Sequence, residues 1–142
     1  MIALLDVNVL IARADRSHQF HDKAQAWLRN QNSLAIATCP LTENGFLRIF
    51  GSPSYPEGPG SVSNAARDLA ALRSRPEHRF FSDSISILEA TDWSAGIGLT
   101  GGQLTDLCLL ALAVKHSAKF VTLDRRIEPS LVVGGLKALV VI

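Results

Sequence analysis

The sequence predicts an α/β fold: a three-layer α/β/α sandwich with a mostly parallel central sheet, formed by a single domain over residues 1–142. Short apolar runs without polar alternation are typical of strands that are buried on both faces. These runs alternate with longer segments of helical periodicity, as in parallel sheets covered by helices. A length of 142 residues suits one hydrophobic core.

The expected elements follow from apolar runs and from turn residues. Strands are expected at residues 2–5, 34–38, 120–123 and 136–142, with a further strand in the region of 79–82 and 85–88. Helices are expected at about 8–13, 20–28, 40–50, from 61 or 63 to about 74, and at 105–116. Residues 51–60 contain three prolines and three glycines, which predicts a loop. Residues 91–102 are expected to be irregular, with a short helix near Trp93, and residues 124–129 to form a turn.

The composition is that of a globular chain, with 47% apolar and 19% charged residues. The formal net charge of +1 neither requires nor excludes a nucleic-acid partner. A mean hydropathy of +0.19 indicates some apolar surface that a partner covers. Cys39 and Cys108 stand in apolar contexts without a metal-binding spacing, so we expect buried free thiols in a reducing compartment.

The first twelve residues are apolar but do not predict a signal peptide. No basic segment precedes them, and Asp6 and Asn8 interrupt them. No apolar run approaches the roughly 18 residues that a membrane span requires. We therefore expect a cytoplasmic protein with no membrane partner.

Four acidic residues are placed to meet at one edge of the predicted sheet. Asp6 and Asp124 each end a strand, Glu43 follows a strand near the start of a helix, and Asp106 opens the helix expected at 105–116. Ligands of open α/β sheets gather beyond the carboxyl ends of the strands. Converging carboxylates repel one another unless a cation neutralises them, and oxygen ligands select Mg²⁺ or Mn²⁺.

Each acid also has a local interpretation. Asp6 can cap the helix that follows it. Glu43 and Asp106 can each complement the positive end of a helix. Asp124 can pair with Arg125 or Arg126 in a turn. The placement of all four at one rim favours the metal site.

Polar residues beside the acids are candidates for orienting them. Asn8 follows Asp6 by two residues, and Thr105 precedes Asp106 directly. Their side chains can donate hydrogen bonds to a carboxylate or a ligand, although Asn8 can also cap a helix. Thr122 has the same capacity and an equally good explanation as a β-branched strand residue.

Three segments resemble a known family. The segments LLDVNVLI, CPLTENGFLRIF and TDLCLLALAVKHSAKFVTLDRRI are similar to those of PIN-domain nucleases, and more narrowly to the VapC toxins of bacterial toxin–antitoxin pairs. The resemblance implies a PIN-like fold and a magnesium-dependent endoribonuclease that leaves 5′-phosphate and 3′-hydroxyl ends. It also implies homodimers and an antitoxin whose tail enters the active-site groove.

Carried onto this sequence, the resemblance implies Asp6, Glu43 and Asp106 as the central acids and Asp124 as the fourth. Asp6, Asp106 and Asp124 are expected to hold Mg²⁺, or Mn²⁺ in its place. The basic residues that we expect to bind the RNA backbone are Arg13, Arg48, Arg125 and Arg126. Single-stranded or loop RNA fits better than a duplex, because a pocket at a sheet rim needs an accessible backbone.

Two other functions stay open at this point. A metal-dependent phosphatase of the haloacid-dehalogenase type is one, although Asn8 stands where that chemistry needs a second acid. The other is a non-catalytic module of the same fold that binds a partner, with acids that serve structure only.

Overall fold

The central sheet is parallel throughout. The structure, a computed structural model, describes residues 1–95 and 98–142. Within these residues the sheet has five strands in the order β3-β2-β1-β4-β5, and every neighbouring pair is parallel. The strands are β1 (Ile2–Leu5), β2 (Ala35–Thr38), β3 (Arg79–Phe80), β4 (Lys119–Thr122) and β5 (Leu139–Val141).

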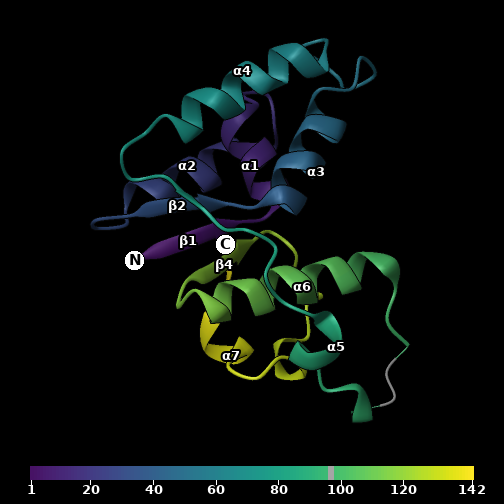
Figure 1. The fold of residues 1–142 in the computed structure, drawn as a ribbon. Helices are drawn as coiled ribbons and strands as arrows, with labels where there is room; N and C mark the ends of the chain where they lie inside the picture. The colour runs from purple at the N-terminus through teal and green to yellow at the C-terminus, as the bar shows by residue number, and fades with distance from the viewer. Residues whose placement is uncertain (96–97) are drawn as a thin grey trace.

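Helices cover both faces of this sheet, so the predicted three-layer architecture is confirmed (Figure 1). One face carries α1 (Val7–Ala14), α2 (His21–Arg29), α3 (Pro40–Phe50) and α4 (Val62–Arg73). The other face carries α5 (Ile87–Ala90), α6 (Gly101–Lys115) and α7 (Gly135–Ala138), with short 3-10 turns at η1 (Trp93–Ala95) and η2 (Pro129–Leu131). In the described part of the chain, no helix is both long and apolar enough to cross a membrane.

Two apolar cores explain why the strands read as continuous apolar runs. Along β1, Ala3 and Leu5 belong to the core under α1–α4, whereas Leu4 belongs to the core under α6. In β4, Val121 belongs to the core under α1–α4 and Phe120 to the core under α6. Successive strand residues point to opposite faces, and both faces are covered, so neither position is polar.

The parallel register brings the carboxyl ends of the central strands to one rim. Leu4 of β1 pairs with Ala37 of β2, and Leu5 pairs with Val121 of β4. The residues that follow these strands, Asp6 after β1 and Leu123 after β4, therefore leave the sheet at the same edge. The rim beside β1 and β4 holds the candidate site.

Helix α6 begins earlier than its apolar run indicates. The predicted start was residue 105, but the helix starts at Gly101, where Thr100 caps it. Thr100 Oγ1 accepts a hydrogen bond from the Gln103 backbone N–H at 3.4 Å, and Gln103 Oε1 accepts one from the Thr100 N–H at 2.9 Å. This reciprocal cap outweighs the low helix propensity of two glycines. Asp106 thus lies in the second turn and does not open the helix.

Other boundaries differ from expectation where apolar runs were short. The strand β3 has only two residues, and 85–88 is not a strand, because α5 begins at Ile87. The expected strand at 136–142 is helical up to Ala138, and β5 covers Leu139–Val141 only. Periodicity cannot distinguish a short buried strand from a helical turn. The segment expected to be irregular, 91–102, includes residues 96–97, which lie outside the described residues.

Candidate active site

Three of the four predicted acids line one pocket at the rim of the sheet. Asp6 follows β1, Asp124 follows β4, and Asp106 projects from α6. They share a pocket of about 370 Å³. Its other lining residues are Val7, Asn8, Ile11, His18, Ile49 and Tyr55. Asp6 thus lies in one pocket with Asp106 and Asp124, which follow it by 100 and 118 residues in the sequence, whereas the strand-end argument placed all four acids there.

Asp6 is the most firmly held of the three. Its side chain is only 7% exposed. Oδ1 accepts a hydrogen bond from the Val7 backbone N–H at 2.6 Å, and Oδ2 accepts from Thr122 Oγ1 at 2.6 Å and from Asn8 Nδ2 at 2.8 Å. Burial raises the pKa of Asp6 above its ordinary value, and the three hydrogen bonds oppose that rise. Asp6 is the N-cap of α1, as its local interpretation predicted, and it also lines the pocket.

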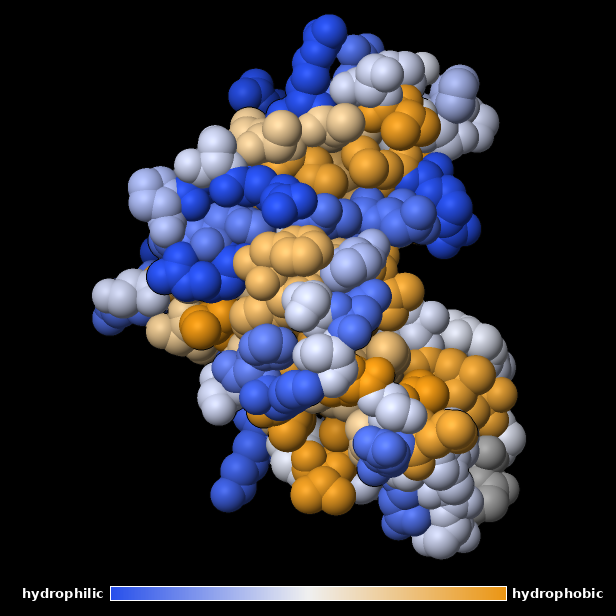
Figure 2. Space-filling view, viewed as in Figure 1, coloured by the Kyte–Doolittle hydropathy of each residue, from blue (hydrophilic) through white to orange (hydrophobic). Residues whose placement is uncertain are grey.

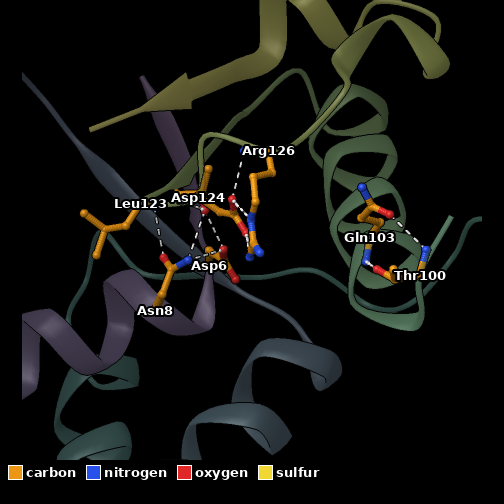
Figure 3. Close-up of polar contacts among 8 residues, drawn as sticks. Asp6, Asn8, Thr100, Gln103, Leu123, Asp124 and Arg126 are labelled. Carbon is orange, nitrogen blue, oxygen red and sulfur yellow. Dashed lines mark hydrogen bonds and ion pairs between the residues drawn. The ribbon is translucent and has the colours of Figure 1, made fainter.

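Asn8 lies beside Asp6 and links the ends of β1 and β4 (Figure 3), and the Thr122 side chain belongs to the same network of hydrogen bonds. Asn8 Nδ2 donates to Thr122 Oγ1 at 3.1 Å, and Asn8 Oδ1 accepts from the Leu123 backbone N–H at 3.1 Å. Thr122 is fully buried, and its hydroxyl also accepts from the Asp124 N–H at 3.0 Å. Thr122 is thus a site residue that sequence reasoning undervalued, since a threonine at a strand end looks like any strand former.

Asp106 is the acid with the least compensation. It is half-buried on α6, and the pKa of its carboxyl is raised to about 6, first by burial and then by the charges of Asp6 and Asp124. Arg126 partly opposes this rise. Among the described residues, no hydrogen-bond donor contributes to holding this carboxylate. A half-buried acid with raised pKa and no donor is suited to binding a cation, which would stabilise its charged form.

Asp124 has a partner of its own. Both its oxygens bind Arg126, with Oδ1 accepting from the backbone N at 2.8 Å and from Nε at 3.0 Å, and Oδ2 accepting from Nη2 at 2.8 Å. Hydrogen bonds from Arg126 hold the pKa of Asp124 below its ordinary value. The pairing with a neighbouring arginine, considered from the sequence, is present, and Arg126 makes it.

Glu43 lies in the first turn of α3 but does not line this pocket. Its Oε1 accepts from Thr38 Oγ1 at 2.7 Å, and its Oε2 accepts from Arg73 Nη1 at 3.2 Å. Thr38 Oγ1 also lies 2.9 Å from His78 Nε2. Nothing in the sequence signals this cluster, because Arg73 and His78 come from α4 and the loop after it.

Of the supporting residues, Asn8 reaches the acids and Thr105 does not. Thr105 is exposed, and its hydroxyl donates to the Gly101 carbonyl of its own helix at 3.5 Å. The misplaced helix start explains this difference, because Thr105 lies a full turn inside α6.

The four predicted basic residues are also dispersed. Arg126 lies at the acids, and Arg48 and Arg125 are exposed. Arg13 pairs with Asp68 at 3.1 Å and lines a different pocket of about 400 Å³.

Comparison with known proteins decides the family. Residues 3–129 match the PIN domain. The chain belongs to the PIN-domain family. This match spans β1 to η2 and includes all three acids of the pocket.

The similar PIN-domain proteins are of the VapC type. The chain is 42% identical to ribonuclease VapC44 of Mycobacterium tuberculosis over 137 residues, covering 96% of each chain. It is 39% identical to ribonuclease VapC38 of the same species over 123 residues, covering 87% of this chain and 85% of that one. The resemblance seen in the three sequence segments is thereby confirmed.

Solved structures share the fold at low sequence identity. A toxin–antitoxin complex from Klebsiella pneumoniae aligns with a TM-score of 0.61 at 21% identity, covering 97% of this chain and 95% of that one. The M. tuberculosis toxin VapC20, which cleaves the sarcin–ricin loop, aligns with a TM-score of 0.59 at 12% identity, covering 81% and 83%. These likenesses confirm the PIN fold.

PIN-domain nucleases generally use a divalent metal, and the donor chemistry of this pocket fits one. Three carboxylates supply only oxygen ligands. The negative charge of Asp106 is disfavoured by burial and by the two neighbouring carboxylates, and a bound cation would stabilise it. Within residues 1–95 and 98–142, however, no three His, Cys, Asp or Glu side chains are already spaced to hold a metal ion.

Proposed function

We propose that this PIN-domain protein is a metal-dependent endoribonuclease that acts in the cytoplasm as the toxin of a toxin–antitoxin pair. The observation that carries the proposal is the convergence of Asp6, Asp106 and Asp124 on one pocket at the strand ends. The similarity to proteins named as VapC ribonucleases supports RNA as the substrate. The phosphatase alternative gains no support, because Asn8 serves as a hydrogen-bonding clamp and has no proton to transfer as an acid.

Each acid has a distinct part in the proposed site. Asp6, held by Val7, Asn8 and Thr122, presents a carboxylate of fixed orientation. The Asp106 carboxylate accepts no hydrogen bond from the described residues, so its oxygens are available to a cation. A bound Mg²⁺ or Mn²⁺ supplies positive charge that polarises the phosphodiester and acidifies water. Asp124 completes the ligand set once Arg126 no longer occupies both of its oxygens.

Glu43 remains in the proposed catalytic set, although it does not line the pocket of the three aspartates. It follows β2, which is the neighbour of β1 in the sheet, so it lies along the same rim. Its ion pair with Arg73 is partly exposed, and such pairs contribute about 0–1 kcal/mol. Exchange of Arg73 for another partner therefore costs little. Arg48, Arg125 and Arg126 are the proposed contacts to the RNA backbone, and Arg13 is the weakest candidate because Asp68 already binds it.

The proposal predicts cleavage of RNA that requires both the metal and the acids. Purified protein, freed of any bound partner, is incubated with single-stranded RNA and Mg²⁺ or Mn²⁺, and the new ends are mapped. We expect 5′-phosphate and 3′-hydroxyl ends. Asp6→Asn and Asp106→Asn should each lower the rate by at least about 100-fold, the scale of losing one key charged group in a site.

Asp22→Asn is the matched control, because Asp22 is an exposed acid on α2 and should leave the rate unchanged. Absence of cleavage by the wild type with either metal on several RNAs would overturn the nuclease assignment. Equal cleavage by the Asn variants would instead overturn the site assignment. Hydrolysis of small phosphomonoesters would favour a phosphatase.

The proposed partners are an antitoxin and a second copy of the chain. Two similar structures, from Klebsiella pneumoniae and Rickettsia felis, contain a toxin with its antitoxin. Figure 2 shows apolar surface over the lower half of the molecule, where α5, α6 and α7 lie. Leu88, Val133 and Leu136 in this region are 75%, 87% and 73% exposed. We expect light scattering after gel filtration to give twice the 15.3 kDa chain mass, and a monomer mass at micromolar concentration would contradict the dimer.

A further inference from the structure

Arg126 binds Asp124, one of the three acids of the proposed metal site. Its side chain comes from the loop after β4 and points to Asp124 (Figure 3). Nε and Nη2 bind one carboxylate oxygen each, at 3.0 Å and 2.8 Å, and the Arg126 backbone N–H adds a third hydrogen bond. This planar fork is the strongest geometry that an arginine offers a carboxylate. Asp124 therefore has no oxygen without a donor from Arg126.

The Arg126 side chain is exposed, but it lies beside the acid pocket. It lines a hollow of about 280 Å³ together with Thr100, Gly102 and Gln103 of the α6 start. Asp106 and Asp124 line this hollow and also the acid pocket, so the two spaces are adjacent and share these two side chains. A fixed positive charge thus stands next to two of the three converging acids.

The ion pair between Arg126 and Asp124 is easier to replace than the hydrogen bonds that hold Asp6. The Arg126 side chain is 85% exposed and that of Asp124 20% exposed, and exposed ion pairs contribute about 0–1 kcal/mol, with a bidentate pair such as this one at the upper end of that range. Asp6, in contrast, is 7% exposed and receives hydrogen bonds from the buried Thr122 and from Asn8. Asp124 is accordingly the acid of the pocket that can change partner.

We infer that Arg126 is an internal counter-ion that closes the site until a metal takes Asp124 from it, and that the released guanidinium then binds a phosphate of the RNA. This inference rests on the proposed nuclease function. The same bidentate arrangement serves both partners, because the two parallel N–H groups of a guanidinium can bind either a carboxylate or a phosphate.

The inference is tested first by metal binding without RNA. Protein stripped with EDTA is titrated with Mn²⁺ by calorimetry. Arg126→Ala removes the competitor, so we expect its Mn²⁺ affinity to rise about 3- to 5-fold, which corresponds to the upper range for an exposed ion pair. Arg126→Lys keeps the charge but not the fork and should fall between the wild type and Arg126→Ala.

Arg125→Ala is the matched control, because Arg125 is the adjacent exposed arginine and its loss changes the net charge equally. It should leave the Mn²⁺ affinity within about 1.5-fold of the wild type, since exposed charges act weakly on one another in salt. An affinity of Arg126→Ala that is no higher than that of Arg125→Ala overturns the inference, and the nuclease proposal stands. A wild type that binds no Mn²⁺ overturns both, since no metal is there to displace Arg126.

The second half of the inference concerns the released guanidinium. At saturating Mn²⁺, Arg126→Ala should lower kcat/KM for RNA cleavage by about 10- to 100-fold, the scale of one charge-assisted hydrogen bond to a phosphate. Tighter metal binding together with slower cleavage is expected only if Arg126 serves both partners. An unchanged kcat/KM would show that Arg126 only blocks the metal and contacts no phosphate.

Discussion

At the scale of single residues, Asp106 illustrates how a fold leaves one group uncompensated. Its carboxylate is half-buried on α6, near Asp6 and Asp124, and receives no hydrogen bond from the described residues. Asp6 and Asp124 each have donors that stabilise their charge. The folded protein without metal therefore carries an unfavourable charge at Asp106, which gives the site its demand for a cation.

This charge predicts a pH-dependent gain of stability for Asp106→Asn. The pKa of Asp106 is about 6 in the folded chain and 3.8 as its ordinary value. The folded state therefore favours the protonated acid below pH 3.8, and this advantage is lost as the pH rises toward 6. Since the carboxyl is half exposed, we expect Asp106→Asn to be more stable by only about 1 kcal/mol at pH 7.5 in EDTA.

Urea unfolding at pH 4 and at pH 7.5 measures this difference. The gain should be close to zero at pH 4, and Asp22→Asn should show none at either pH. A gain of the same size at both pH values would mean that burial of the charge is not its cause.

Residue types alone identified the acids but not their partners. Asp6, Asp106 and Asp124 could be selected because each stands at the end of a strand or beside an apolar helix. The hydroxyl of Thr122 and the fork of Arg126 could not be assigned, because their roles depend on which side chains the folded chain places within 3 Å of them. Thr105 was selected by adjacency in sequence, and its side chain points elsewhere.

At the scale of elements, α6 positions Asp106 and closes one face of the sheet. Six of its residues are buried, including Leu107, Leu109 and Leu110. Its first turn depends on the reciprocal cap of Thr100 and Gln103, since Gly101 and Gly102 resist the helical conformation. That turn also borders the hollow that holds Arg126.

Removal of this cap should loosen the site more than the fold. Thr100→Ala is expected to lower the free energy of unfolding by about 1 kcal/mol, the usual cost of losing an N-cap. Hydrogen exchange should accelerate in 101–106 and remain slow at Leu109 and Leu110. Thr105→Ala, on the same helix and exposed, should change neither. Uniform acceleration along α6 would show that the cap supports the whole helix.

At the scale of the whole molecule, the site exists only where three distant segments meet. Asp6, Asp106 and Asp124 come from β1, from α6 and from the end of β4, so a shared cation would tie both faces of the sheet together. Any ligand that binds only the folded state stabilises it by mass action.

Metal should therefore raise the stability of the entire chain. At 100 times its dissociation constant, Mg²⁺ is expected to add about 2.7 kcal/mol to the free energy of unfolding. Thermal unfolding in MgCl₂ and in NaCl of equal ionic strength measures the effect. Asp106→Asn should lose most of it, and Asp22→Asn should keep it. Equal shifts in wild type and Asp106→Asn would place the metal elsewhere.

The sequence by itself determined the layered α/β architecture, the helix-and-strand order of residues 2–74, and the rim where four acids were expected and three line one pocket. These features follow from local patterns: apolar runs of strand length, helical periodicity, and parallel strands that end on one side. Only the tertiary structure decided the partners. Glu43 accepts hydrogen bonds from Arg73 and Thr38, and Asp124 accepts them from Arg126, whereas Asp106 has no donor among the described residues. The reason is physical: a hydrogen bond or ion pair acts over a few ångströms, and sequence distance does not record which side chains come that close.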